Sequence, residues 1–102
     1  IVMKTVLVTG GAKRLGAAIS RRLARSGWKV VIHYRGSASE AEALAGEISA
    51  LTIAADLVDA AAAEALPARA SALLAGPLDA VVNSASVFEY NTAATFAAED
   101  FD

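Results

Sequence analysis

The chain has 102 residues, 56% of them hydrophobic, and a formal net charge of −2, which suits one small domain or part of a larger one. It contains no cysteine and one histidine, so disulfides, thiolate metal sites and imidazole clusters are excluded and metal chemistry is not expected. No apolar run approaches the roughly 18 residues of a membrane span, and the first residues lack the apolar region of a signal peptide. We therefore expect a soluble cytoplasmic protein that does not bind membranes.

The charges are distributed unevenly along the chain. Residues 1–37 hold eight of the nine basic side chains and no acid, whereas residues 38–102 hold all eleven acids. A basic segment can attract nucleic acid or a phosphorylated small molecule. Three arginines, Arg21, Arg22 and Arg25, fall on the predicted solvent face of a helix. Three more cations fall at predicted turns, where they fit a compact phosphate site better than a nucleic-acid surface: Lys13, Arg14 and Arg35.

Strands and helices are predicted to alternate along the chain. Apolar runs predict four strands, over Lys4–Thr9, Trp28–Tyr34, Leu51–Ala55 and Leu78–Asn83. The segments between them predict three helices, over Arg14–Ser26, Ala38–Ser49 and Asp59–Leu74, the first closed by Gly27 as a C-cap. The order βαβαβαβ predicts an α/β fold with a doubly wound parallel sheet of strand order 3-2-1-4.

Two places depart from the regular pattern. Pro67 lies inside the third helical segment and is expected either to kink the helix or to begin a second one. The connection Ile48-Ser49-Ala50-Leu51 contains no glycine or proline and is tight even for a short loop. Either this loop is truly short or residues are missing there, and we favour the second interpretation.

The end of the chain suggests that the domain continues. Residues 84–96 are small and polar, as in a loop, and Ala97-Ala98-Glu99-Asp100 is typical of the acidic first turn of another helix. The fourth strand would also be an unpaired edge, which intact proteins usually cover. We expect residues 1–102 to be the N-terminal part of a single dinucleotide-binding domain, with the catalytic remainder outside this chain.

The most informative motif is the glycine-rich turn Thr9-Gly10-Gly11-Ala12-Lys13-Arg14-Leu15-Gly16, which joins the first strand to the first helix. Glycines let the backbone turn tightly, and the free N–H groups of a helix's first turn favour an anion. The usual dinucleotide fingerprint is G-x-G-x-x-G, whereas this turn has an arginine in place of a middle glycine.

Three motifs in register resemble the short-chain dehydrogenase/reductase family. They are the Thr9–Gly16 turn, Asp56-Leu57 after the third strand, and Asn83-Ser84-Ala85-Ser86 after the fourth. The resemblance covers essentially the whole chain and implies a Rossmann fold, a nicotinamide cofactor and hydride transfer. Arg14, the Asn83–Ser86 variant, His33-Tyr34-Arg35-Gly36-Ser37-Ala38 and Ser86-Val87-Phe88 are most similar to the pteridine reductases, including the dihydromonapterin reductase-like branch.

The resemblance assigns most cofactor contacts to the turn and the second strand's end. Gly10 permits the turn, Gly16 lets the helix pack near the strand and leaves room for pyrophosphate, and the Leu15 N–H is a phosphate donor.

A cation at a helix N-terminus opposes the dipole, so Arg14 calls for a compensating anion. The second strand ends without an acid, which favours NADPH over NADH. We predict that the adenosine 2′-phosphate contacts Arg14, Arg35 and Ser37, with Lys13 a weaker candidate and Tyr34 lining the site. His33 is expected to be a strand-end residue rather than a specific ligand, although its backbone could line the ribose.

Further contacts are implied after the third and fourth strands. Asp56 is expected to accept from the adenine amino group with Leu57 beside it, although Asp56 could instead cap the following helix, a role that Asp59 could also fill. Asn83 is assigned to sheet integrity and the cofactor's edge, and Ala85 to the adenosine side. Ser86 and Phe88 match substrate-contacting positions, where the aromatic ring would stack on a flat pterin, although Phe88 could nearly as well belong to the core or anchor the loop.

The family's proton donor, a tyrosine followed four residues later by lysine, is absent. Tyr34 is followed by Ala38 and Tyr90 by Ala94, so no catalytic residue is assigned within the chain. The favoured function is the cofactor half of an NADPH-dependent reductase acting on a pteridine. The alternatives are a reductase of ketones or dehydrogenase of alcohols, and a non-catalytic NADPH-binding module; a nucleic-acid binder is disfavoured by the net acidity. The family is usually dimeric or tetrameric, so we expect a homo-oligomer of the longer protein.

Overall fold

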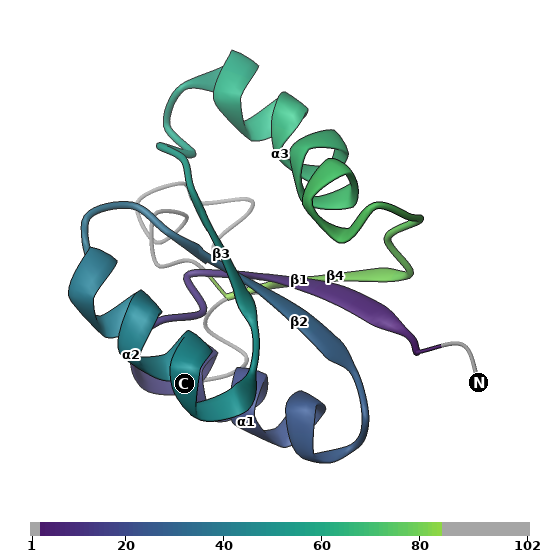
Figure 1. Cartoon of the computed structure of the whole chain (residues 1–102). Coiled ribbons are helices and arrows are strands. Elements are labelled where there is room, and N and C mark those ends of the chain that lie inside the picture. The colour runs from purple at the N-terminus through teal and green to yellow at the C-terminus, as the bar shows by residue number, and fades with distance from the viewer. Residues whose placement is uncertain (1–2, 85–102) are drawn as a thin grey trace.

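The computed structural model describes residues 3–84, which form alternating strands and helices (Figure 1). The strands are β1 (Thr5–Thr9), β2 (Lys29–Tyr34), β3 (Leu51–Ala54) and β4 (Ala80–Asn83). The helices are α1 (Arg14–Arg25), α2 (Ala38–Ile48) and α3 (Ala60–Leu74). All strand pairs are parallel and their order is β3-β2-β1-β4. The predicted α/β fold and strand order are therefore confirmed.

The helices cover both faces of the sheet (Figure 1). Alternate residues of β1 and β2 point to opposite faces. Val6, Val8, Val30 and Ile32 pack towards α1 and α2, whereas Leu7, Val31 and Ile53 pack towards α3. Since β1 and β2 are buried on both faces, they are almost continuously apolar, which is why the sequence pattern identified them readily. No helix within residues 3–84 is both long enough and apolar enough to cross a membrane.

Some element boundaries differ from the predicted ones. The first helix ends at Arg25 with Ser26 as its C-cap, and Gly27 follows with a φ of +93°, a conformation that glycine adopts without strain. The fourth strand begins at Ala80 rather than Leu78. Just before it, Asp79 and Thr5 bind each other through both backbone and side-chain groups, so this stretch is held by a local side-chain network.

Pro67 lies inside one continuous helix, so of the two expectations, a kink or the start of a second helix, the second is wrong. Leu66 and Ala70 lie on either side of it and are both buried against Leu7 and Val31, which holds the two halves of α3 on the same sheet. The helix instead begins after Asp59, whose carboxylate accepts from the N–H groups of Ala61 at 3.0 Å and Ala62 at 3.3 Å. Asp59, not Asp56, caps α3.

The connection between α2 and β3 takes the short form. Ser49 closes the helix in the left-handed conformation, with a φ of +58°, and Ala50 alone separates it from Leu51. A non-glycine residue in this conformation is strained. The connection between α2 and β3 can be this short because Ser49 adopts a strained left-handed conformation.

Candidate cofactor site

The carboxyl ends of the four parallel strands meet at one edge of the sheet, and the candidate residues follow those ends. In open α/β sheets ligands bind at this edge, where the strand order reverses direction. Here the reversal lies between β1 and β4, because β2 and β3 extend to one side of β1 and β4 to the other. The glycine-rich turn leaves β1 at this point.

The glycine-rich turn is packed too closely to accept larger residues. Gly10 has a φ of +63°. A Cβ on Gly16 would overlap the carbonyl oxygen of Gly10 and lie 2.9 Å from the Gly11 Cα, and a Cβ on Gly11 would lie 2.8 Å from the Val8 carbonyl oxygen. The predicted packing role of Gly16 is confirmed. Buried Ser20 donates a 3.3 Å hydrogen bond to the Gly11 carbonyl and fixes the turn from the α1 side.

The start of α1 carries positive charge and no carboxylate. Lys13 is the N-cap and makes no side-chain capping bond, and the first turn contains no acid. Arg14, the residue that replaces a glycine of the common pattern, has a φ of +49°. An arginine in this region costs about 1–2 kcal/mol. Lys13 and Arg14 are exposed and Leu15 is half-buried. The N-terminal end of α1 therefore presents two cations beside the N–H groups of its first turn, an arrangement that favours an anion.

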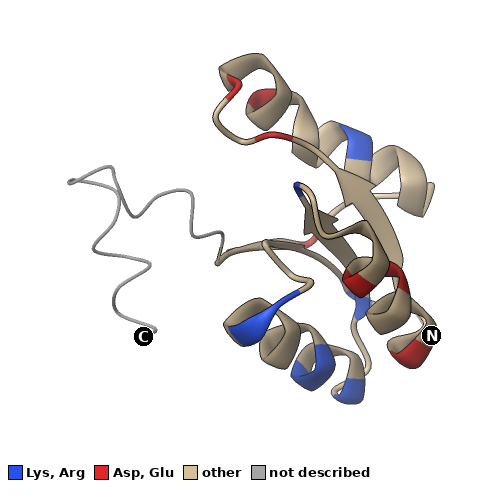
Figure 2. Cartoon of the chain, turned by 90° about the vertical axis from the view of Figure 1, so that its left-hand side faces the viewer, with Lys and Arg blue, Asp and Glu red and all other residues tan. Residues whose placement is uncertain are grey.

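Two ion pairs hold cations at the edge of this site. Arg35 Nε lies 3.6 Å from Asp56 Oδ1, and Lys13 Nζ lies 3.8 Å from Glu40 Oε2. All four side chains are at least half exposed, so each pair is weak and its cation can exchange the carboxylate for another anion. Ser37, the N-cap of α2, uses no side-chain capping bond, and its hydroxyl is therefore free of that role. Figure 2 shows the basic residues along α1 and its preceding turn.

The residues after β3 divide into one exposed acid and one packed side chain. Asp56 Oδ1 accepts a 3.0 Å hydrogen bond from the Val58 N–H, which shapes the turn, and it does not cap α3. Leu57 is half-buried and packs against the cluster between the sheet and α3. Tyr34 likewise packs, against the cluster on the α1 and α2 face. Asp56 is thus left as a half-exposed carboxylate that follows β3 and pairs with Arg35.

Asn83 ties β4 to β1 at the same edge. It pairs with Thr9 in the sheet register, and its Oδ1 accepts a 2.9 Å hydrogen bond from the Thr9 hydroxyl. Thr9 also accepts from the Ser84 N–H at 3.1 Å, and the Ser84 hydroxyl donates to the Thr9 carbonyl. The expected sheet role of Asn83 has a direct structural counterpart, and Thr9 is a partner that the sequence did not single out.

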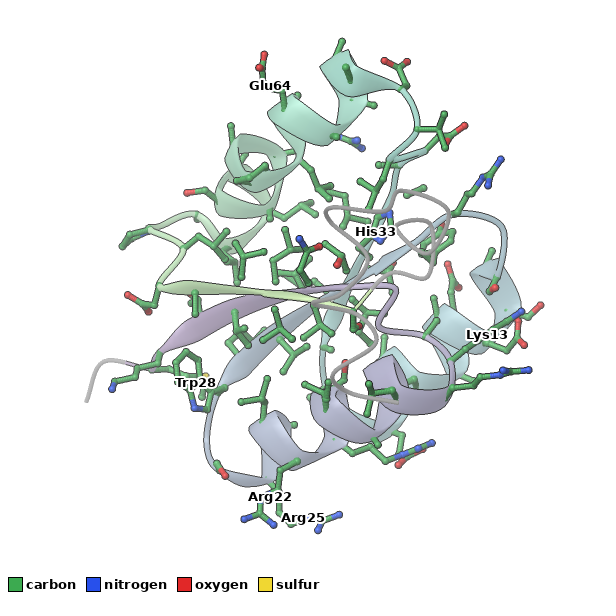
Figure 3. All side chains as sticks on the ribbon, turned by 180° about the vertical axis from the view of Figure 1, so that it is seen from behind. Lys13, Arg22, Arg25, Trp28, His33 and Glu64 are labelled. Carbon is green, nitrogen blue, oxygen red and sulfur yellow. The ribbon has the colours of Figure 1, made fainter. Side chains whose placement is uncertain are left out.

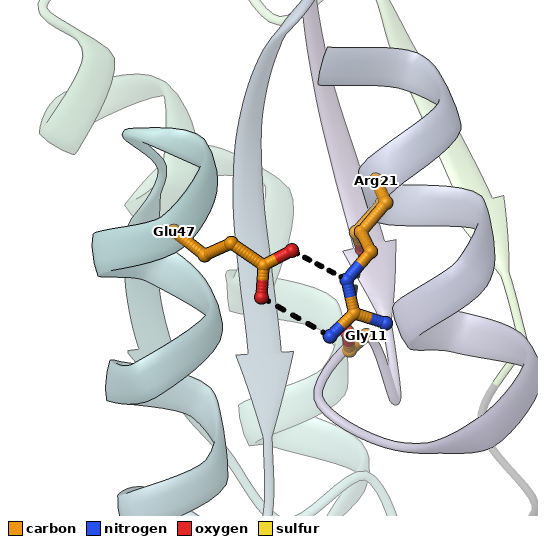
Figure 4. A network of polar contacts seen from close by, with 4 residues as sticks. Gly11, Arg21 and Glu47 are labelled. Carbon is orange, nitrogen blue, oxygen red and sulfur yellow. Dashed lines mark hydrogen bonds and ion pairs between the residues drawn. The ribbon is translucent and has the colours of Figure 1, made fainter. Parts of the chain in front are cut away.

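A bidentate contact links the two helices on one face of the sheet. Arg21 of α1 donates to both carboxylate oxygens of Glu47 of α2, at 2.7 and 3.2 Å (Figure 4). This contact lowers the pKa of Glu47 and raises that of Arg21. Arg22 and Arg25 remain on the exposed face of α1, away from Lys13 at the other end of the helix (Figure 3). The expected solvent exposure of Arg21, Arg22 and Arg25 on α1 is confirmed.

His33 lies near the end of β2, as predicted, and makes two contacts that the sequence did not indicate. It is 2% exposed, and both ring nitrogens form hydrogen bonds, to the Gly10 N–H and to the Ala55 carbonyl. Burial lowers the pKa of the imidazole. A histidine inside an otherwise apolar strand was the available signal, since a buried polar side chain requires partners. The remaining predicted site residues, Ala85, Ser86 and Phe88, lie outside the described residues.

Comparisons with known proteins agree with this geometry. The family model for short chain dehydrogenases matches residues 4–102. The chain is 38% identical to pteridine reductase 1 of Leishmania tarentolae, over 80% of the chain and 36% of that protein. It is 32% identical to 3-oxoacyl-[acyl-carrier-protein] reductase of Staphylococcus aureus, over 97% of the chain and 42% of that protein. It therefore spans well under half the length of these relatives.

A solved structure is also similar to this chain in sequence and fold. FolM alternative dihydrofolate reductase 1 from Brucella canis, determined as a complex with NADP, is 41% identical and superposes with a TM-score of 0.76 over 83% of this chain and 36% of its own. The predicted similarity to pteridine reductases is confirmed by this structure and by the Leishmania relative. With its doubly wound sheet, glycine-rich turn and matching family model, the chain belongs to the short-chain dehydrogenase family.

Proposed function

We propose that residues 1–102 are the NADPH-binding part of a longer, cytoplasmic reductase. The observation that carries this proposal is the set of cations and hydroxyls at the ends of β1 and β2, with no acid in the turn between β2 and α2. A cofactor without a 2′-phosphate needs an acid there to accept from the ribose hydroxyls, whereas a phosphorylated one needs cations.

Each residue of the site then has a role in binding. Gly10, Gly16 and the Leu15 N–H form the pyrophosphate end, and the strained Arg14 faces the 2′-phosphate with Arg35, Ser37 and Lys13. On binding, Arg35 exchanges its exposed carboxylate partner, Asp56, for the phosphate, and Asp56 then accepts from the adenine amino group. Leu57, Tyr34, Asn83 and Ala85 line the cofactor. When bound, the cofactor supplies the hydride; this chain's residues hold and orient it.

The proposed substrate is a pteridine, in line with the similarity to pteridine reductase 1 and the FolM structure. Ser86 and Phe88 would contact it, the ring stacking on the flat heterocycle. The general acid lies in the part of the protein beyond this chain, which we propose forms a homo-oligomer.

The test uses the protein at its natural length, with NADPH or NADH and either a dihydropteridine or a simple ketone. We expect oxidation of NADPH with the dihydropteridine and little turnover with NADH. Turnover of the ketone alone would favour the second candidate, which the similarity to 3-oxoacyl-[acyl-carrier-protein] reductase supports. NADPH binding without any turnover would indicate a non-catalytic module, and preference for NADH would contradict the cofactor assignment.

A further inference from the structure

The imidazole of His33 links two backbone segments that belong to different ends of the site. Its Nδ1 accepts from the Gly10 N–H at 2.9 Å, so Nδ1 carries no proton. Its Nε2 lies 2.8 Å from the Ala55 carbonyl oxygen, which can only accept, so Nε2 carries the hydrogen. These contacts fix one neutral tautomer and leave neither nitrogen for a ligand. Figure 3 shows where His33 lies in the fold.

The two partners lie on opposite sides of β2. Gly10 follows β1 and opens the glycine-rich turn, whereas Ala55 follows β3 and directly precedes Asp56. Backbone bonds already continue the sheet here, from the Gly11 N–H to the His33 carbonyl at 3.0 Å and from the Ala55 N–H to the Tyr34 carbonyl at 3.1 Å. The side chain adds a second connection that spans all three strand ends.

An apolar residue would fill this position at lower cost if packing were the only requirement. Val31, two residues earlier on the same face, is fully buried among Leu7 and Ile53. A buried imidazole must be desolvated, and it is compensated here by two hydrogen bonds to backbone groups outside the regular strands. We therefore attribute the histidine at position 33 to its two hydrogen bonds, with Gly10 and Ala55, rather than to packing.

We propose that His33 is a positioning residue that sets the spacing between the pyrophosphate-binding turn and the adenine-binding end of β3, so that one dinucleotide engages both. This inference rests on the proposed function. A ligand that contacts two sites gains from their fixed spacing, because its second contact is intramolecular. A ligand that contacts only one site does not depend on that spacing.

Two substitutions separate the bonds. In His33→Asn the amide oxygen replaces Nδ1 and keeps the acceptor for Gly10, and in His33→Gln the amide nitrogen replaces Nε2 and keeps the donor for Ala55. His33→Leu removes both bonds. Leu66→Val, in α3 on the same face of the sheet, is the control for a mild loss of packing. Unfolding is measured for each variant so that binding is compared only among folded proteins.

The probes are NADPH, which spans both ends, and adenosine, which carries no phosphate and so engages only the adenine-binding end after β3. At natural length, we expect each single-bond variant to bind NADPH roughly three- to tenfold more weakly, as the loss of one hydrogen bond implies. Binding of adenosine should stay within about twofold of the unsubstituted protein. Leu66→Val should leave both affinities unchanged.

Other outcomes overturn the inference. Equal weakening of both probes would give His33 a general structural role, and an effect from only one of the two amide variants would assign it to one end alone. Unchanged NADPH binding in both would remove it from the site. Failure of the unsubstituted protein to bind NADPH would instead reject the proposed function, so the two failures are distinguishable.

Discussion

The backbone of Gly16 lies against the carbonyl group of Gly10, so closely that a Cβ on Gly16 would overlap the Gly10 oxygen. The first turn of α1 is thereby pressed onto the end of β1, and the N–H groups of that turn are brought to the edge of the sheet where the strand order reverses. The geometry depends on the absence of one methyl group.

Gly16→Ala should therefore displace the turn. We expect about 1–3 kcal/mol of lost stability from overpacking and at least tenfold weaker NADPH binding, measured by denaturant unfolding and by titration. Gly46→Ala in α2 is the matched control, because a Cβ there meets nothing within 4 Å; it should raise stability by about 1 kcal/mol. Normal NADPH binding by Gly16→Ala would show that the turn does not need this close contact.

Arg14 combines an unfavourable backbone conformation with a charge proposed to bind phosphate, and two substitutions separate these properties. Arg14→Gly relieves the strain at φ +49° and should raise stability by about 1 kcal/mol, whereas Arg14→Ala keeps the strain. Both should weaken NADPH binding by roughly 10- to 100-fold, the value of a charge-assisted hydrogen bond. NADH binding should hardly change. Equal weakening of both cofactors would contradict the assignment of Arg14 to the 2′-phosphate.

The strain at Ala75 has no such proposed function. This residue closes α3 with a φ of +56°, and glycine is the residue that this C-cap position favours. We expect Ala75→Gly to raise the free energy of unfolding by about 1 kcal/mol and to leave NADPH affinity unchanged. A destabilised variant would mean that the gain in chain entropy of the unfolded state exceeds the relief of strain.

The sequence predicted the elements better than the contacts between them. The runs Val6–Val8 and Val30–Ile32 are buried on both faces, so composition alone identified them as central strands. The contact of His33 with Gly10 and Ala55 depends on the register of three strands, which no local pattern encodes. Pro67 shows the same limit: local propensity predicted a break or kink, and the burial of Leu66 and Ala70 keeps one helix. Tertiary contacts outweigh local preference at both places.

The His33 contacts also predict how stability depends on pH. Burial lowers the pKa of the folded imidazole below its usual 6.5, and protonation would place an N–H of the ring against the Gly10 N–H. Because the unfolded state then binds more protons than the folded state, stability is fully present above pH 6.5 and falls as pH decreases through the window between 6.5 and the lower folded pKa.

His33→Gln should remove this slope, since the amide does not titrate. Glu47 provides an internal comparison, because its pKa is lowered from 4.5 by the hydrogen bond from Arg21 and its contribution is lost only as pH falls below that value. Denaturant unfolding at pH values from 7.5 down to about 5 therefore isolates His33, whose usual pKa lies inside that range while that of glutamate lies below it. A slope that persists in His33→Gln would assign the titration to another group.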